Sequence, residues 1–331
     1  MKIPEHNYFQ EITYRDALRL AMYDEMKEDD KVIILGEDVA NYGGAYGVTK
    51  NLLDLFGEKR VIDTPISEPT IIGTAIGAAM TGLKPIAELM YVDFFGMSMD
   101  QIGNQSAKIR YMFGGQISVP MVIRTQGGTG RSGGAQHSQS LESWIMHIPG
   151  LYLSMPSNPH DAYHLLRESL QTNTPTVFIE HKMLYNFKGP LDKRKKLNFG
   201  SANIIKPGTD ISIITYSRMT NYALEASVLL EKDNISVEII DLRTLNPLDK
   251  LTIIKSIKKT KNALVLSEGH YTTGVASEIT SIIFENCFKY LEKPVIRYTA
   301  EDTPVPVAPN LEKRYVPTVE NIVRYCKKIL D

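Results

Sequence analysis

The sequence predicts an α/β protein built from two domains in series. The chain has 331 residues, of which 43% are hydrophobic and 23% are charged. This is an ordinary globular composition in a chain too long for one small core. Short β-branched runs alternate along it with helical patterns. Because helices that connect consecutive strands favour parallel pairing, we expect mainly parallel sheets.

In the first half of the chain, β-branched runs predict strands and amphipathic spacing predicts helices. The expected strands are residues 31–35, 60–63, 85–89, 121–124, 151–155 and 176–180. The expected helices are residues 13–27, 69–81, 98–112 and 159–170.

The pattern then breaks at a segment that we interpret as a linker. Residues 186–202 contain Gly189, Pro190, a basic run at 193–196 and Gly200, without sustained periodicity. The first domain is therefore expected at 1–185 and the second at 203–331. In the second domain, strands are expected at 211–216, 237–241, 263–267 and 295–297, and helices at 221–231, 275–288 and 319–330.

Charge and composition exclude several classes of function. Lys plus Arg number 37 and Asp plus Glu 38, so the net charge of −1 gives no attraction for nucleic acid or an anionic membrane. The 2 cysteines suit a reducing compartment. No apolar run resembles a signal peptide or reaches the roughly 20 residues of a spanning helix. We expect a cytoplasmic protein with neither a nucleic-acid nor a membrane partner, and no spacing typical of a closed metal site.

The segment Asp63-Thr-Pro-Ile-Ser-Glu68-Pro69 lies where an expected strand ends and a helix begins. Pro69 suits the first helical position, and a residue before proline is disfavoured in helical conformation, so Glu68 is expected at the helix mouth. Small apolar residues follow and predict close packing that shields the carboxylate from water. This carboxylate is either a helix cap favoured by the helix dipole or a functional acid.

A glycine-rich segment, Gly127-Gly-Thr-Gly-Arg-Ser-Gly-Gly-Ala-Gln-His137-Ser-Gln, is the second candidate. Backbone N–H groups of such loops can approach a phosphate closely, although the spacing fits no nucleotide-binding motif. His137 is suited to proton transfer near neutral pH. The alternatives are a mobile turn and a structural histidine.

Two further segments follow expected strands. Gly36-Glu37-Asp38-Val39 occupies a strand end, where α/β enzymes place ligand-binding groups, or is simply a turn with a cap. Tyr91-Val-Asp-Phe94-Phe95 brings aromatic rings past another strand end. These rings either stack on a flat heterocycle or belong to the core.

Together these segments resemble the β subunits of the thiamine-diphosphate-dependent 2-oxo acid dehydrogenase family, which includes pyruvate, branched-chain 2-oxo acid and acetoin dehydrogenases. The resemblance covers nearly the whole chain. Its main blocks are residues 36–39, 63–68, 100–102, 136–139, 149–151, 241–243 and 302–306. It implies a thiamine-diphosphate-binding pyrimidine domain followed by a transketolase C-terminal-like domain.

The resemblance also implies roles for single residues. Glu68 matches the glutamate that hydrogen-bonds the pyrimidine ring of thiamine diphosphate, a role suited to a shielded acid whose pKa is raised. Phe94 matches the aromatic residue that stacks on this ring. The remaining residues matched to the pocket wall are Glu37, Ile66, Ser67 and Met90.

For His137, the resemblance implies proton transfer and contact with the lipoyl arm of a dihydrolipoyl acyltransferase. The same resemblance implies that the C-terminal domain docks this acyltransferase rather than contributing catalytic side chains.

The sequence departs from a complete cofactor site in two ways. The family's diphosphate and magnesium motif, Gly-Asp-Gly followed by Asn, does not occur. The resemblance therefore implies an α subunit that holds the magnesium, in an assembly of two α and two β chains. Many relatives have Asp-x-Asn-Pro at a potassium loop, whereas residues 172–175 read Thr-Asn-Thr-Pro, so only backbone carbonyls are left to bind potassium.

The predicted activity is that of an oxidoreductase that decarboxylates pyruvate and acylates a lipoyl group, with its disulfide as acceptor. Residues 88–90, 93–94 and 180–182 resemble acetoin dehydrogenases, so acetoin is the alternative substrate. A self-sufficient transketolase would need the missing diphosphate motif. A non-catalytic assembly or regulatory protein would retain the fold without the chemistry.

Overall fold

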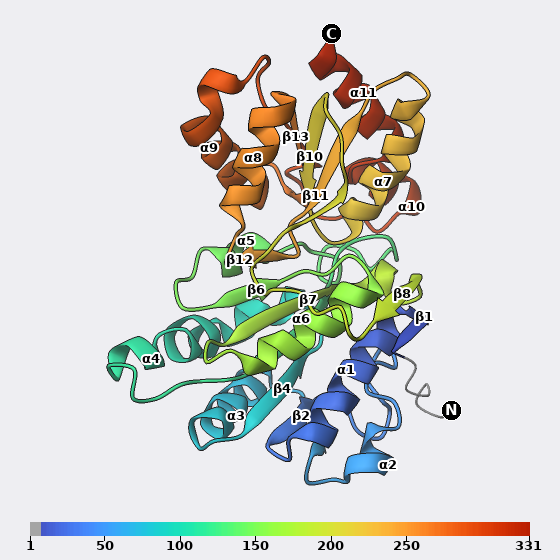
Figure 1. Cartoon of the computed structure of the whole chain (residues 1–331). Coiled ribbons are helices and arrows are strands. Elements are labelled where there is room, and N and C mark those ends of the chain that lie inside the picture. Colours follow the sequence, from blue (N-terminus) through green and yellow to red (C-terminus); the bar gives the residue numbers. More distant parts are fainter. Residues whose placement is uncertain (1–7) are drawn as a thin grey trace. The chain divides into compact units, whose positions relative to one another are not determined.

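The computed structural model describes residues 8–331 (Figure 1). Residues 1–7, with which the first expected domain begins, lie outside the described residues. The chain forms two compact units. One comprises the chain up to Gly127 together with Trp144–Phe199, and the other comprises Gly128–Ser143 together with Gly200–Asp331. The glycine-rich segment therefore belongs to the second unit, although the first unit surrounds it in sequence.

The first unit contains a parallel sheet with the strand order β6-β7-β5-β4-β2-β3. Its strands are β2 (Val32–Gly36), β3 (Val61–Asp63), β4 (Lys84–Leu89), β5 (Val122–Gly127), β6 (Tyr152–Ser154) and β7 (Thr176–His181). Every residue of β2, β5 and β7 is buried, as expected for parallel strands covered on both faces.

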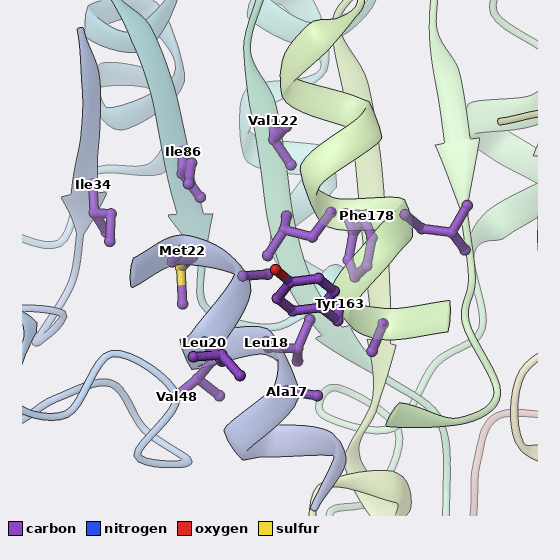
Figure 2. Packing of buried hydrophobic residues seen from close by; sticks show 14 of the residues in the cluster. Ala17, Leu18, Leu20, Met22, Ile34, Val48, Ile86, Val122, Tyr163 and Phe178 are labelled. Atoms are coloured by element: carbon purple, nitrogen blue, oxygen red, sulfur yellow. The ribbon is translucent and has the colours of Figure 1, made fainter. Parts of the chain in front are cut away.

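Helices cover this sheet. They are α1 (Tyr14–Glu28), α2 (Leu52–Phe56), α3 (Glu68–Met80), α4 (Ile109–Met112) and α6 (Pro159–Gln171), with a 3₁₀ helix η1 (Val92–Ser98), a π-helical turn η2 (Asp100–Ser106) and a 3₁₀ turn η3 (Lys182–Leu184). Figure 2 shows Leu18 of α1 beside Tyr163 of α6, near Phe178 of the sheet. Met22 of α1 lies on the side of Ile86. Side-chain caps by Thr13 and Asn158 fix where α1 and α6 begin.

A buried ion cluster lies within this sheet. Arg124 on β5 is completely buried, and its guanidinium donates to Glu180 on β7 at 2.6 and 2.9 Å and to Glu88 on β4 at 2.8 Å. Burial alone would lower the pKa of Arg124, but the carboxylates of Glu180 and Glu88 outweigh it and raise that pKa. Arg124 therefore stays charged, and it fixes the side chains of the strands on either side of it.

The second unit has the sheet order β14-β13-β10-β11-β9, parallel except for β9. Its strands are β9 (Asn203–Lys206), β10 (Ile211–Thr215), β11 (Val237–Asp241), β12 (Thr244–Asn246), β13 (Ala263–His270) and β14 (Ile296–Ala300). Its helices are α7 (Arg218–Glu231), α8 (Lys250–Thr260), α9 (Val275–Cys287), η4 (Phe288–Tyr290), α10 (Pro309–Tyr315) and α11 (Val319–Leu330), while α5 (Glu142–Met146) begins at the end of the inserted segment. Helices α7 and α11 cover one face and α8 and α9 the other (Figure 1).

The expected elements are present with three differences. The helix expected at 98–112 is divided among η1, η2 and α4, because Gly103 and neighbouring polar residues are poor helix formers. The expected linker at 186–202 contains β8 (Lys188–Asp192), which pairs antiparallel with β1 (Phe9–Thr13). Helices α2, α5, α8 and α10 and strands β1, β9 and β12 were not expected. Among the described residues, no helix has the length and apolar character needed to cross a membrane.

The ion cluster leads to a stability prediction. Arg124→Ala should lower the free energy of unfolding by about 3–5 kcal/mol, because it leaves two buried carboxylates without their cation. Urea denaturation measures this loss. Arg194→Ala is the matched control, since Arg194 also pairs with a carboxylate, Asp192, but its side chain is 67% exposed. Equal losses in the two variants would contradict a structural role for the cluster.

Candidate functional site

The first group of predicted site residues lies at one edge of the first sheet. Strands β4, β2 and β3 are adjacent and parallel, so their carboxyl ends lie at the same edge. Glu37 directly follows β2, the segment leading to Glu68 follows β3, and Met90 and Phe94 follow β4. Helix α3 packs against η1, which brings the last two of these segments together. Ligands of open α/β sheets bind at this kind of edge.

Two features hold the segment after β2 in place. A Cβ atom added at Gly36 would lie 2.6 Å from the carbonyl oxygen of Glu88, so only glycine permits this approach of β2 to β4. At the end of β3, the carboxylate of Asp63 accepts hydrogen bonds from the backbone N–H of Ala40 at 2.6 Å and of Asn41 at 3.1 Å. The backbone around Glu37 is therefore fixed by both neighbouring strands.

The carboxylates of Glu37 and Glu68 interact electrostatically. Burial raises the pKa of Glu37, and the negative charges of Glu68, Asp38 and Glu88 raise it further. Glu37 and Glu68 are both half-buried.

The position of Glu68 differs by one residue from the expected one. Helix α3 begins at Glu68 rather than at Pro69, and Ser67 is the extended residue that precedes it. Glu68 is therefore in the first helical turn, where the helix dipole favours a carboxylate. Its half-buried side chain is less shielded in this chain than expected.

The apolar part of this edge is partly uncovered. Ile66 is 80% exposed, and Met90 and Phe94 are half-buried. Gln126, which the sequence analysis did not identify, supports the segment that follows β4. The Gln126 side chain accepts from the backbone N–H of Tyr91 at 3.1 Å and donates to Glu88 at 2.9 Å, which links this segment to the ion cluster. Polar residues inside otherwise apolar strands were the signal that could have found this residue.

His137 belongs to the second unit, on the loop that runs from Gly128 to Gln139. The loop is closed by a hydrogen bond of 3.0 Å from the Gly128 N–H to the Gln139 carbonyl. The His137 N–H in turn donates to the Gly134 carbonyl at 3.3 Å, and the His137 side chain is half-buried. The loop is thus a folded unit rather than a slack turn.

Two glutamates that the sequence analysis missed hold this loop. Glu268 at the end of β13 accepts from the backbone N–H and the hydroxyl of Thr129, both at 2.7 Å. Glu312 on α10 accepts from the N–H of Gly130 at 2.7 Å and of Ser132 at 3.1 Å. These amides were considered as phosphate donors, but carboxylates of the chain itself occupy them. Glu268 directly follows the strand expected at 263–267, and a position after an expected strand is the same signal that pointed to Glu37.

A third carboxylate lies at the end of the inserted segment. Glu142 is buried and accepts from the hydroxyl of Tyr216 at 2.7 Å, and that hydroxyl lies 2.7 Å from Ser267. Burial raises the pKa of Glu142, and the hydrogen bond from Tyr216 only partly offsets this.

Each half of the chain matches a known domain family. Residues 10–188 match the family "Transketolase, pyrimidine binding domain", and residues 200–322 match "Transketolase, C-terminal domain". A solved structure titled "Split gene transketolase, inactive beta4 tetramer" has a TM-score of 0.81 and 19% sequence identity, with 96% of this chain and 98% of that chain covered. The class is therefore a transketolase-type pair of domains, which confirms the predicted fold class.

Curated relatives narrow this class. The pyruvate dehydrogenase E1 component subunit beta of Rickettsia conorii is 42% identical over 320 residues, covering 96% of this chain and 98% of that protein. Mitochondrial subunit beta-2 of the same component from Oryza sativa is 42% identical over 96% of this chain and 86% of that protein. Acetoin:2,6-dichlorophenolindophenol oxidoreductase subunit beta of Bacillus subtilis is 41% identical, covering 96% and 97%. This chain belongs to the family of 2-oxo acid dehydrogenase E1 β subunits, as its resemblance predicted.

The buried Glu142 predicts a pH dependence of stability. Its folded pKa lies above the ordinary value of 4.5, so ionisation at higher pH opposes folding. The groups facing it are Tyr216, Glu268 and His270. Glu142→Gln keeps an acceptor for Tyr216 without the charge. The free energy of unfolding of this variant relative to wild type should therefore rise as the pH increases above about 4.5.

Urea denaturation at pH values from about 4.5 to 8 measures this difference. Glu225→Gln, which removes an exposed carboxylate of α7 in the same unit, is the control for a general charge effect. A relative stability of Glu142→Gln that falls over this interval would contradict a buried ionisation.

Proposed function

We propose that this chain is the β subunit of a pyruvate dehydrogenase E1 component that uses thiamine diphosphate and works only with an α subunit. The observation that carries this proposal is the 42% identity to such β subunits over nearly the whole chain. The partly uncovered edge at the ends of β2, β3 and β4 supports it, because it offers the groups that the pyrimidine end of the cofactor needs.

The residues of this edge fit one half of the cofactor. The partly exposed ring of Phe94 and the exposed Ile66 offer an apolar surface for a flat heterocycle. Glu68 would hydrogen-bond a ring nitrogen, with Glu37 as the neighbouring carboxylate. Ser67 and Met90 complete the pocket wall. When bound, the cofactor supplies the carbanion-stabilising chemistry, and the protein positions it and controls its protonation.

The other half of the cofactor needs a partner. Without a Gly-Asp-Gly motif in the 331 residues, we assign the diphosphate and magnesium to an α subunit, in an assembly of two α and two β chains. Potassium is not part of this proposal. Residues 172–175 match the potassium loop of relatives. There the Thr172 hydroxyl donates to the Thr174 carbonyl at 2.8 Å, so one of the few carbonyl oxygens that could bind potassium already accepts a hydrogen bond.

His137 is assigned to proton transfer and to contact with the lipoyl arm of a dihydrolipoyl acyltransferase. An imidazole can both donate and accept a proton, and the half-buried position of His137 leaves part of its side chain accessible. The acceptor of the overall reaction is then the lipoyl disulfide. The proposed location of the protein is the cytoplasm.

Pyruvate is the proposed substrate and acetoin the alternative. The acetoin-like segments include Glu88 and Glu180, but both carboxylates bind the buried Arg124. These two carboxylates therefore stabilise the interior of the sheet, so their presence does not indicate which substrate is bound. The acetoin relative is nevertheless nearly as similar as the pyruvate ones, at 41% against 42% identity.

Reconstitution tests this proposal. We expect the purified chain alone to be inactive, and the chain co-purified with its α subunit to reduce 2,6-dichlorophenolindophenol in the presence of pyruvate. Acetoin and a branched-chain 2-oxo acid are assayed in parallel. Preference for acetoin would replace the substrate assignment, and activity without α would indicate a self-sufficient enzyme. Inactivity with every substrate, despite a stable α–β complex, would favour the non-catalytic alternative.

In the reconstituted enzyme, Glu68→Gln should reduce dye-linked turnover by about 10²-fold or more, because an amide retains the shape but not the acid–base function. Circular dichroism and thermal unfolding check that the variant remains folded. Glu58→Gln, an exposed position of the same unit, is the charge-matched control. Near-normal turnover with reduced thermal stability would assign Glu68 to capping of α3 instead.

A further inference from the structure

The loop carrying His137 has the backbone geometry of an anion-binding loop. Gly128, Gly130, Ser132 and Gly134 have φ angles of 85°, 103°, 53° and 71°, so left-handed residues alternate with others. Such alternation turns successive N–H groups toward one side, where they commonly hold a phosphate. Here the anions are two carboxylates of the chain itself. Glu268 and Glu312 are only 6% and 5% exposed.

We propose that Glu268 and Glu312 are positioning residues that set the conformation of the His137 loop. They do so by binding the N–H groups of Thr129, Gly130 and Ser132. This inference rests on the proposed function for the role of His137. It also adds to the role expected of the C-terminal domain. Besides docking the acyltransferase, this domain would hold the loop that carries His137.

The two buried glutamates and the glycine-rich loop stabilise one another. A buried carboxylate is unfavourable unless hydrogen bonds replace its water, and charge-assisted bonds from N–H groups are the strong kind. Conversely, a loop with so many glycines loses much conformational entropy on ordering. Fixing three of its amides on rigid elements, the end of β13 and helix α10, supplies that order.

The constraint passes along the loop to His137. A Cβ atom at Gly133 would lie 2.8 Å from the Ser138 hydroxyl oxygen and 3.1 Å from the His137 carbonyl oxygen, so the anchored part packs directly on the histidine segment. The hydrogen bond from Gly128 to Gln139 closes the loop on its other side. Movement at Gly130 and Ser132 therefore displaces His137.

Loop anchoring is tested first, by a measurement that does not depend on activity. Arg131 lies within the loop and is exposed, so trypsin cleavage after it reports loop opening. Glu312 uses both carboxylate oxygens, one for Gly130 and one for Ser132. We expect cleavage at Arg131 to accelerate by about 10-fold or more in Glu312→Ala, and by less in Glu312→Gln, which retains one acceptor oxygen.

Hydrogen exchange of peptides covering residues 128–140 should rise in the same order, and Glu268→Ala should behave like Glu312→Ala. Glu225→Gln, with the same charge loss on an exposed face of α7, should match wild type in both measurements. Wild-type cleavage and exchange rates in folded Glu312→Ala and Glu268→Ala would overturn the proposal.

Positioning is tested second, in the complex with the α subunit. Glu312→Ala should lower the rate of transfer to a lipoyl domain by about 10-fold, as expected on displacing a positioned group. Circular dichroism and thermal unfolding show whether the variant is folded. In a His137→Ala background the same substitution should cost less than about 2-fold, because a residue that acts through His137 has nothing left to position.

Full additivity of the two substitutions, or normal lipoyl transfer by a variant with an open loop, would overturn the positioning role. A wild-type complex that fails to use pyruvate would refute the proposed function instead. In that case proteolysis and hydrogen exchange would still decide whether Glu268 and Glu312 hold the loop.

Discussion

The first unit depends on the ion pairs that the buried guanidinium of Arg124 forms with Glu88 and Glu180. Arg124 lies on a strand between two others, and it holds a carboxylate on each of them. A charge without water is tolerated only where its partners surround it, so the side chains of β4, β5 and β7 have one mutual arrangement. Through Glu88 and Gln126 the same cluster fixes the backbone of Tyr91, at the start of the segment that carries Phe94. The interior of the sheet and the edge at the ends of β2, β3 and β4 are therefore parts of one polar network.

The second unit uses carboxylates in another way. Its buried glutamates have backbone amides and a tyrosine hydroxyl as partners rather than a cation. Hydrogen bonds of this kind stabilise a defined loop conformation. The chain thus uses buried carboxylates in two ways, as partners of a buried guanidinium in the first unit and as acceptors for amides and hydroxyls in the second.

Much of the architecture followed from the sequence, for physical reasons. Buried parallel strands such as β11 are continuous β-branched runs, and helices such as α11 have strong amphipathic spacing, so both were predicted with their observed bounds. The family resemblance predicted one pocket for Glu37, Glu68 and Phe94, and in the structure their segments follow adjacent parallel strands that end at the same edge. Strand β8 was missed because it contains Gly189 and Pro190 and gains its order from pairing with β1, a partner distant in sequence. Glu268 and Glu312 were missed because each accepts hydrogen bonds from a loop more than 130 residues away in the sequence. No local sequence pattern indicates such a contact.

The insertion of Gly128–Ser143 into the second unit has a consequence for synthesis on the ribosome. The loop emerges long before the groups that bind it, since Glu268 follows Thr129 by 139 residues and Glu312 follows Gly130 by 182. At roughly 5–20 residues per second, the loop waits about 10–40 s without its anchors. The first unit can assemble most of its sheet during this interval, but the histidine loop cannot take its final form until helix α10 has left the ribosome. In a nascent chain of this protein, the edge at the ends of β2, β3 and β4 can therefore form before the loop that carries His137.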